Sequence, residues 1–396
     1  MNIYADHAAT TPVSEAALAA MMPCFREIYG NPSSLHTPGQ RAAEKLAEAR
    51  EVFARLLNVE PREITFTSGG SESDNQALRS GAAWGAKKGK RHIVSTKFEH
   101  HAVLHTLQAL EKEGFEVTLL DIPENGIVTA EQVKAALRED TCLVSVMFAN
   151  NEIGTIQPVA EIGRVCREAG VLFHTDAVQA CGHVLVNIKE LNVDMLSLSA
   201  HKFHGPKGVG VLYARRGIPL VNVIHGGAQE RGKRAGTENV PAICGAAAAF
   251  EAACANLESE AERLTALRDK LIAGLTKLPH TVLNGDAQRR LPGNVHLCFE
   301  GIEGESLLLL LDDAGVEASS GSACTSGSLD PSHVLLALGR PHEVAHGSLR
   351  LTLSYETTEE EVDHIIKTVP RIVAQLREIS PVWDALERGE KEFILK

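Results

Sequence analysis

The stretch from residue 172 to residue 202, LFHTDAVQACGHVLVNIKELNVDMLSLSAHK, decides the fold. It holds two short, largely apolar runs, 172–175 and 195–199, whose length and composition are typical of buried strands. Polar residues follow both runs: Asp176 comes directly after the first, and Lys202 lies three residues beyond the second. Ligands bind at the carboxyl ends of the strands in an open parallel sheet, so we expect functional side chains at these positions.

Strand-like runs of this kind alternate with helical patterns through the first two thirds of the chain. Parallel strands need crossover helices, so the alternation predicts an α/β fold with a largely parallel sheet covered on both faces. The other predicted strands are 64–67, 92–95, 116–120, 143–148 and 209–213, and the helices predicted between the earlier ones are 71–86, 102–113, 130–138 and 159–168.

A second unit follows the region of the sheet. The alanine-rich stretch 241–278 is typical of one or two long helices that carry the chain out of the first unit. Beyond it we predict two strands, 294–299 and 348–353, and two helices, 304–313 and 358–379.

Composition and charge narrow the class of protein. The chain has 396 residues, 44% hydrophobic and 23% charged, which argues against disorder and fibrous structure. The formal net charge of -12 leaves no basic surplus for nucleic acid or an anionic membrane. Apolar stretches such as 242–250 fall short of the ~18 residues of a membrane span, and the acidic Asp6 lies where a signal peptide would be basic and then apolar. We therefore expect a cytoplasmic protein that binds neither nucleic acid nor a membrane.

One of the eight cysteines has unusual surroundings. The cysteines form no CxxC pair and no regular spacing, so neither a disulfide framework nor a zinc ribbon is indicated, and we expect most to be buried thiols. Cys324 differs, because the stretch 319–328, SSGSACTSGS, is small and polar, the opposite of a core environment.

A glycine turn after the predicted strand 64–67 is a candidate phosphate site. The sequence at 67–75 is TSGGSESDN, and the amide groups at a helix start, with the positive end of the helix dipole, suit a phosphate. An ordinary glycine turn with a serine N-cap is an equally good interpretation of this stretch alone. Neither GxGxxG nor GxxxxGK[ST] is present, which disfavours a Rossmann or P-loop nucleotide site.

Asp176 and Lys202 are candidates of another kind. A carboxylate at the end of a buried strand needs a partner such as a cation or a protonated ring nitrogen, although a helix-capping role is equally open for Asp176 alone. A desolvated lysine at the same edge can act as a Schiff-base amine, although most lysines are solvated surface charges. Together, a phosphate site, a buried Asp and a Schiff-base Lys fit pyridoxal phosphate, whose phosphate, ring nitrogen and aldehyde need those partners.

The whole chain resembles the pyridoxal-phosphate-dependent cysteine desulfurases of the aminotransferase class V family, most closely the NifS type that supplies sulfur for nitrogenase iron–sulfur clusters. The resemblance runs nearly end to end and rests on seven motifs. They are GNPSSLH at 30–36, TSGG at 67–70, NNE at 150–152, HTDAVQA at 174–180, SAHK at 199–202, RAGTEN at 234–239 and the Ser/Gly stretch 319–328.

The resemblance implies the fold type I architecture of pyridoxal-phosphate-dependent transferases. It implies a large cofactor-binding domain over 15–258 with a mostly parallel sheet. A smaller α+β domain, formed by 1–14 and 259–396, is expected to carry the catalytic cysteine loop at about 319–330.

The resemblance also implies which residues hold the cofactor. Lys202 is similar to the lysine that forms the Schiff base, Asp176 to the partner of the protonated ring nitrogen, and Gln179 to the partner of the phenolic oxygen. His100 resembles the imidazole that stacks on the ring and moves protons. The residues that match phosphate ligands are Gly70 through its amide, Ser71, Ser199, His201 and Thr237, the last reaching the phosphate of the partner subunit in a homodimer.

The expected reaction converts L-cysteine to L-alanine. Asn151 and Arg350 resemble the pair that orients the substrate carboxylate, a task that suits a bidentate guanidinium. Lys202 is expected to remove the α proton, and Cys324 matches the nucleophile that takes the sulfur as a persulfide, which requires an accessible thiolate. The implied sulfur acceptor is a scaffold protein of the U type for iron–sulfur cluster assembly.

Departures from the family pattern and alternatives complete the prediction. Ser71 stands where Thr is usual, and the stretch 6–9, DHAA, stands where Asp-Asn-Asn-Ala is common.

The alternative functions are a selenocysteine lyase or aminotransferase of the same class, a housekeeping desulfurase and a non-catalytic sulfur carrier. The presence of Lys202 argues against the sulfur carrier. His101 and His105 lie one helical turn apart, but no third ligand is evident, so we predict no metal.

Overall fold

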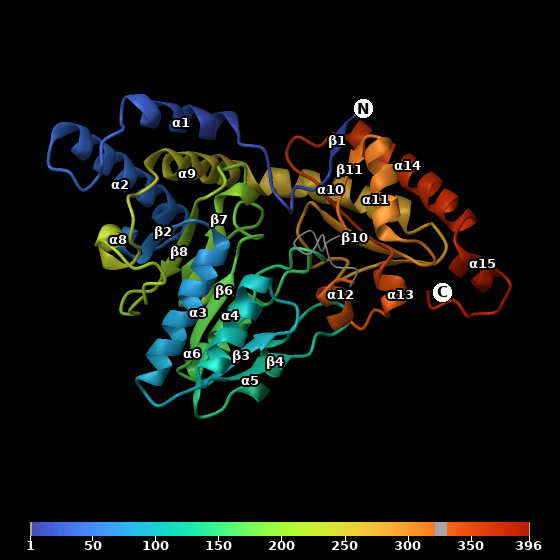
Figure 1. Cartoon of the computed structure of the whole chain (residues 1–396), viewed down its shortest axis with the longest axis horizontal. Helices are drawn as coiled ribbons and strands as arrows, with labels where there is room; N and C mark the ends of the chain where they lie inside the picture. The colour runs from blue at the N-terminus through green and yellow to red at the C-terminus, as the bar shows by residue number, and fades with distance from the viewer. Residues whose placement is uncertain (1, 321–330, 396) are drawn as a thin grey trace.

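A seven-stranded sheet organises the larger part of the chain (Figure 1). The computed structural model describes residues 2–320 and 331–395. The strand order is β2 (Ile64–Thr67), β8 (Gly210–Ala214), β7 (Met195–Ser199), β6 (Leu172–Asp176), β5 (Thr141–Ser145), β3 (His92–Thr96) and β4 (Glu116–Leu120).

The sheet is parallel from β7 to β4, as predicted, and β8 runs antiparallel to both of its neighbours. The connection 200–209 between β7 and β8 explains the reversal, because it is shorter than the dozen or so residues that a parallel crossover needs. This short connection carries Lys202.

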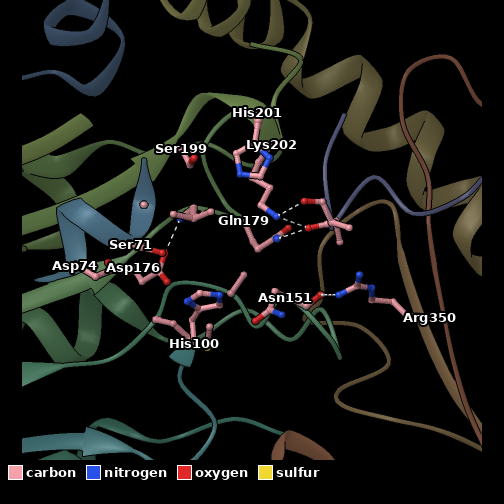
Figure 2. Close-up of a pocket in the computed structure, with 16 residues that line it drawn as sticks. Ser71, Asp74, His100, Asn151, Asp176, Gln179, Ser199, His201, Lys202 and Arg350 are labelled. Carbon is pink, nitrogen blue, oxygen red and sulfur yellow. Dashed lines mark hydrogen bonds between the residues drawn. The ribbon is translucent and has the colours of Figure 1, made fainter. Parts of the chain in front are cut away.

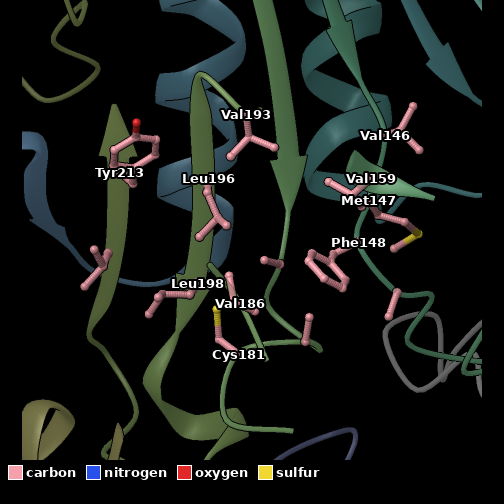
Figure 3. Packing of buried hydrophobic residues seen from close by; sticks show 14 of the residues in the cluster. Val146, Met147, Phe148, Val159, Cys181, Val186, Val193, Leu196, Leu198 and Tyr213 are labelled. Atoms are coloured by element: carbon pink, nitrogen blue, oxygen red, sulfur yellow. The ribbon is translucent and has the colours of Figure 1, made fainter. Parts of the chain in front are cut away.

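Helices cover both faces of the sheet, and the alternation of side chains along the strands explains why. Leu143 and Met195 point into a cluster with α3 (Gly70–Ala86) and α4 (His101–Lys112), whereas the next residues, Val144 and Leu196, point into the opposite cluster. The helices with buried residues in that second cluster, part of which Figure 3 shows, include α2 (Thr37–Leu57), α5 (Ala130–Ala136), α6 (Val159–Glu168) and α9 (Val240–Ala255).

The second unit has an antiparallel sheet in the order β12 (Ser348–Thr352), β10 (Asn294–Phe299), β9 (Thr281–Leu283). The N-terminal strand β1 (Ile3–Tyr4) pairs in parallel with β11 (Val316–Glu317), so the two ends of the chain meet in one core. The helices packed there are α10 (Leu257–Leu275), α11 (Gly304–Asp313) and α14 (Glu359–Glu378).

The remaining helices connect or border these units. They are α1 (Glu15–Arg26), α7 (Ile188–Leu191), α8 (Gln229–Gly232), α12 (His333–Ala337), α13 (His342–Ala345) and α15 (Pro381–Glu387). Val334 of α12 and Val344 of α13 pack into the core of the large sheet, although both lie far beyond residue 258. The domain boundaries at residues 14 and 258 stay a prediction.

The long alanine-rich stretch forms two helices instead of one, since α9 and α10 meet at a bend of 72°. In the part of the chain that the structure describes, a single helix long and apolar enough to cross a membrane does not occur, and only this bent pair reaches the required length and composition when joined.

Candidate functional site

A cavity of about 420 Å³ lies at the carboxyl ends of the parallel strands (Figure 2). It collects side chains that come from the ends of β6 and β7, from the starts of α3 and α4, from the N-terminal segment and from β12. The lining residues are Ala8, Ala9, Gly70, Ser71, Asp74, His100, Met147, Ala149, Asn151, Asp176, Val178, Gln179, Ser199, His201, Lys202 and Arg350.

Lys202 ends the short 3-10 helix η2 (Ala200–Lys202) that follows β7. Its Nζ atom donates to the carbonyl oxygens of Ala8 at 2.6 Å and Ala9 at 2.7 Å (Figure 2). The same Ala8 oxygen accepts a hydrogen bond from Nε2 of Gln179 at 3.0 Å. The N-terminal segment therefore holds the lysine and the glutamine at one wall of the cavity.

Asp176 is the last residue of β6, with 5% of its surface exposed. Its Oδ1 atom accepts the amide hydrogen of Val178 at 2.9 Å. Burial raises the pKa of Asp176 to about 6, and the Val178 amide and the charge of Lys202 oppose that rise. A carboxylate in this position is stabilised by any cation that enters the cavity.

His100 is the N-cap of α4, and its Nδ1 atom accepts the amide hydrogen of Ala102 at 3.1 Å. Burial, with the positive charge of Lys202, lowers the pKa of His100 to about 4. The ring is therefore neutral at pH 7. Because Nδ1 is an acceptor, the proton of the neutral ring lies on Nε2.

A second cavity of about 340 Å³ adjoins the first and shares four of its residues, Gly70, Ser71, Ser199 and His201. These residues bring together the first turn of α3, two hydroxyl groups and an imidazole, which suits a phosphate. A Cβ atom at Gly70 would lie 2.6 Å from Cγ2 of Val178, so only glycine fits where α3 begins.

Arg350 lies on β12 and is 2% exposed. Its guanidinium donates to the Asp6 carboxylate at 2.7 Å and to the carbonyl oxygen of Asn151 at 3.0 Å. The two residues predicted to orient the substrate carboxylate are thus in direct contact at the end of the cavity away from Ser71 (Figure 2).

One predicted site residue, Thr237, does not line the first cavity. Thr237 is exposed and lines a separate cavity of about 50 Å³, which shares Ser68 and Gly208 with the second cavity. Cys324 lies outside the described residues. The described residue Ser319 exchanges backbone hydrogen bonds with Arg350, and beyond the segment Ser332 donates to the Glu152 carboxylate.

The structure adds site residues that the sequence analysis missed. Asp6, Ala8 and Ala9 hold Arg350, Lys202 and Gln179, but carbonyl contacts from a distant segment leave no signal in the sequence. Asp74 also lines the cavity. Its position three residues after Ser71 places it on the same helical face, a signal that could have identified it.

The donor set fits pyridoxal phosphate. The cavity holds an amine, a buried carboxylate, an imidazole and an amide, and it opens onto a hydroxyl-lined helix start at one end. Lys202 would hold the aldehyde, Asp176 the ring nitrogen and His100 the face of the ring. Gln179 would hold the phenolic oxygen, and the group around Ser71 would hold the phosphate. These individual roles stay predictions.

Three histidine rings of α4 and α12 lie close together. The rings of His101 and His105 lie 5.1 Å apart, and His333 lies 4.5 Å from His101. Within residues 2–320 and 331–395, no group of three or more His, Cys, Asp or Glu side chains is arranged to hold a metal ion.

Comparisons with known proteins agree with this geometry. The aminotransferase class-V family matches the chain over residues 3–365. The cysteine desulfurase IscS of Clostridium botulinum strain Hall is 53% identical over 394 residues, which are 99% of both chains. The cysteine desulfurase IscS of Methanosarcina thermophila is 53% identical over 380 residues, 96% of this chain and 94% of the relative. A solved structure named a NifS-like protein has a TM-score of 0.89 and 42% identity, covering 95% of this chain and all of its own.

Proposed function

Because the chain belongs to the aminotransferase class-V family and is a pyridoxal-phosphate-dependent cysteine desulfurase, we propose that it converts L-cysteine to L-alanine and takes the sulfur as a persulfide on Cys324. The observation that supports this most is the single cavity that joins Lys202, Asp176 and His100 to Asn151 and Arg350. One small amino acid in this cavity can therefore reach the amine of Lys202, the imidazole of His100 and the guanidinium of Arg350.

The atoms of the reaction balance without an oxidant. The bond between Cβ and Sγ of the substrate breaks, a bond between that sulfur and the Cys324 sulfur forms, and the thiol hydrogens remain on the persulfide and on alanine. When bound, pyridoxal phosphate supplies an electron sink for bond cleavage next to the substrate's α carbon. The chain must therefore supply orientation, proton transfer and a nucleophilic thiolate.

Each side chain of the cavity has the chemical group that one of these tasks needs. Arg350 and the side chain of Asn151 orient the substrate carboxylate, because the guanidinium is buried and held by Asp6. The Lys202 amine moves the α proton, and the Asp176 carboxylate provides the negative charge that a protonated ring nitrogen needs. His100, neutral at pH 7 because burial lowers its pKa to about 4, exchanges a proton through Nε2.

Cys324 is within chain reach of the cavity. It follows Ser319 by five residues, a span of at most about 18 Å at 3.3–3.6 Å per residue. Ser319 is hydrogen-bonded to Arg350, a lining residue of the cavity. The attachment of this stretch beside the substrate anchor supports Cys324 as the sulfur acceptor.

Mapping of the persulfide tests the proposal. After reaction with L-cysteine in the absence of reductant, peptide mass spectrometry should find one added sulfur atom on Cys324. The matched control is Cys254→Ala, a half-buried thiol that does not line the cavity, which should leave the added sulfur in place. An added sulfur on another cysteine in the wild type, with Cys324 unmodified, contradicts the assignment.

We further propose a homodimer in which Thr237 reaches the phosphate of the partner subunit. Its exposure supports a contact with a second subunit. Mixed dimers of Thr237→Ala and Lys202→Ala chains test it. If Thr237 acts across the interface, mixing should restore one high-affinity cofactor site; no restoration indicates a role within its own chain.

The sulfur is proposed to serve iron–sulfur cluster assembly in the cytoplasm, on a scaffold protein of the U type, with nitrogenase maturation as the destination. The resemblance of the sequence to the NifS type motivates the last point, and the IscS relatives support general assembly. Deletion of the gene in its host separates the two. Loss of growth on dinitrogen alone supports nitrogenase maturation, whereas loss of growth on ammonium as well indicates a housekeeping role.

A further inference from the structure

A second buried carboxyl group lines the cofactor cavity. Asp74, in the second turn of α3, is 1% exposed and lines the cavity together with Asp176. Figure 2 shows both residues at the same end of the cavity, beside Ser71. None of the tasks assigned above uses Asp74.

The surroundings of Asp74 hold little to balance a negative charge. In the described part of the chain, its Oδ1 atom has no hydrogen-bond partner, and the nitrogen atom within ion-pair distance belongs to His174, at 3.6 Å. The two ring nitrogens of His174 lie 2.9 Å from the Ser145 hydroxyl and 3.0 Å from the Ser197 hydroxyl. Burial lowers the pKa of His174 to about 3, so the ring is neutral.

Asp176 has stronger stabilisation of its negative charge than Asp74 has. It accepts the Val178 amide hydrogen at 2.9 Å, and the positive charge of Lys202 stabilises its ionised form. A hydrogen bond with the Ser197 hydroxyl partly favours the charged form of Asp74, but the other titratable groups that face it are Asp176 and Glu99, both carboxyl groups and neither a cation. A buried carboxylate with acidic neighbours and no cation is strongly unfavourable, and such a group takes up a proton instead.

We propose that Asp74 carries the single proton of a buried Asp74–Asp176 pair, and that it thereby positions one negative charge, on Asp176, at the ring-nitrogen end of the cofactor site. Asp74 is a positioning residue here, because it acts through Asp176. The inference rests on the proposed role of Asp176 and deepens it. In agreement with the geometry, burial and the nearby Asp176 raise the pKa of Asp74 well above its usual range.

The sign of the pH effect on stability follows from this assignment. Between the usual pKa of aspartate and the raised pKa of Asp74, the folded chain holds a proton that the unfolded chain has released. The free energy of unfolding attributable to Asp74 therefore falls as pH rises through this range. Asp74→Asn removes the effect, because the amide mimics the protonated acid.

The first test is the melting temperature of the cofactor-stripped full chain as a function of pH. Relative to the wild type, Asp74→Asn should melt at a similar temperature near pH 4 and on the order of 2–4 °C higher at pH 8. A melting temperature below that of the wild type across the whole range would overturn the proposal, since it would mean that the ionised carboxylate stabilises the fold.

The second test reads the proton directly by infrared spectroscopy at pH 7. The carbonyl stretch of a protonated carboxylic acid should weaken in Asp74→Asn. Glu99→Gln is the positive control: Glu99 is fully buried and burial raises its pKa to about 8, so this variant should weaken the band as well. A wild-type spectrum that loses this band in Glu99→Gln but not in Asp74→Asn would contradict the assignment.

The third test distinguishes failure of this inference from failure of the proposed function. Asp176→Asn should weaken cofactor binding at least about tenfold, whereas Asp74→Asn should change the pH titration of the cofactor's visible absorbance little. A large shift in the absorbance titration of Asp74→Asn overturns the inference. Unchanged cofactor affinity in Asp176→Asn overturns the role of Asp176, while the melting data still decide which carboxyl holds the proton.

Discussion

At the scale of single residues, the site is built from buried charges with assigned partners. Arg350 is held by Asp6, Lys202 by two carbonyl oxygens of the N-terminal segment, and Asp176 by the Val178 amide. Buried charges without partners are unfavourable, so each contact both stabilises its group and fixes its direction. Substrate orientation therefore depends on residues that do not line the cavity, of which Asp6 is the clearest.

Substitution of Asp6 should weaken substrate binding more than turnover. In Asp6→Ala the guanidinium of Arg350 loses a charged hydrogen bond, so we expect the KM for L-cysteine to rise on the order of tenfold with a smaller change in kcat. Steady-state kinetics measure this. Glu317→Ala, which removes an exposed acid on the neighbouring strand β11, is the control, and an unchanged KM in Asp6→Ala would refute the role of Asp6.

At the scale of elements, the start of α3 connects the sheet to the phosphate end of the cavity. Gly70 begins the helix directly above Val178, with room for hydrogen only. The first turn of the helix can then approach both the Ser199 hydroxyl and the cavity. The close approach of this helix to the loop after β6 explains why a glycine occupies the position.

Gly70→Ala should lower cofactor affinity about tenfold, which corresponds to about 1.4 kcal/mol. The new Cβ would lie 2.6 Å from Cγ2 of Val178, a stiff β-branched side chain, so the first turn of α3 must move away from the phosphate. Titration of the cofactor-stripped chain with pyridoxal phosphate measures the affinity. In Val178→Ala the clashing methyl group is absent, so adding Gly70→Ala to that variant should lower the cofactor affinity much less than tenfold. A full tenfold loss in the double variant relative to Val178→Ala would contradict the steric explanation.

At the scale of the whole molecule, the protein keeps many histidines neutral in its interior. In the described part of the chain, histidines with a lowered pKa outnumber buried carboxyl groups with a raised pKa by ten to four. Burial lowers the pKa of six of the ten to about 3 or 4. Below the usual histidine pKa, the unfolded chain therefore binds more protons than the folded chain.

Stability should consequently fall as pH is lowered from 7 to 5. Each buried neutral histidine contributes up to about 1.4 kcal/mol per pH unit in this window, and the raised carboxyl groups offset part of it. Denaturant titrations of the cofactor-stripped full chain at several pH values measure the free energy of unfolding. A value that is constant or higher at pH 5 would contradict the assignment of neutral buried histidines.

The sequence predicted the parts of this molecule that follow local patterns. Lys202, Asp176 and the turn at Gly70 could be identified because each follows a short apolar strand, and a largely parallel sheet covered on both faces was confirmed. The helices α1 and α2 were not predicted, because the alternation of strands and helices begins only at residue 64. The contacts of Asp6, Ala8 and Ala9 arise from the pairing of β1 with β11, which joins segments more than 300 residues apart.

The central claim is that L-cysteine is converted to L-alanine with the sulfur retained on Cys324. A single-turnover reaction of the wild-type protein with L-cysteine and no reductant, with alanine and protein persulfide counted together, tests it most directly. We predict one alanine and one persulfide per active site, and the loss of both in Cys324→Ala although that variant still binds the cofactor. Alanine formation in Cys324→Ala at the wild-type rate would contradict the account.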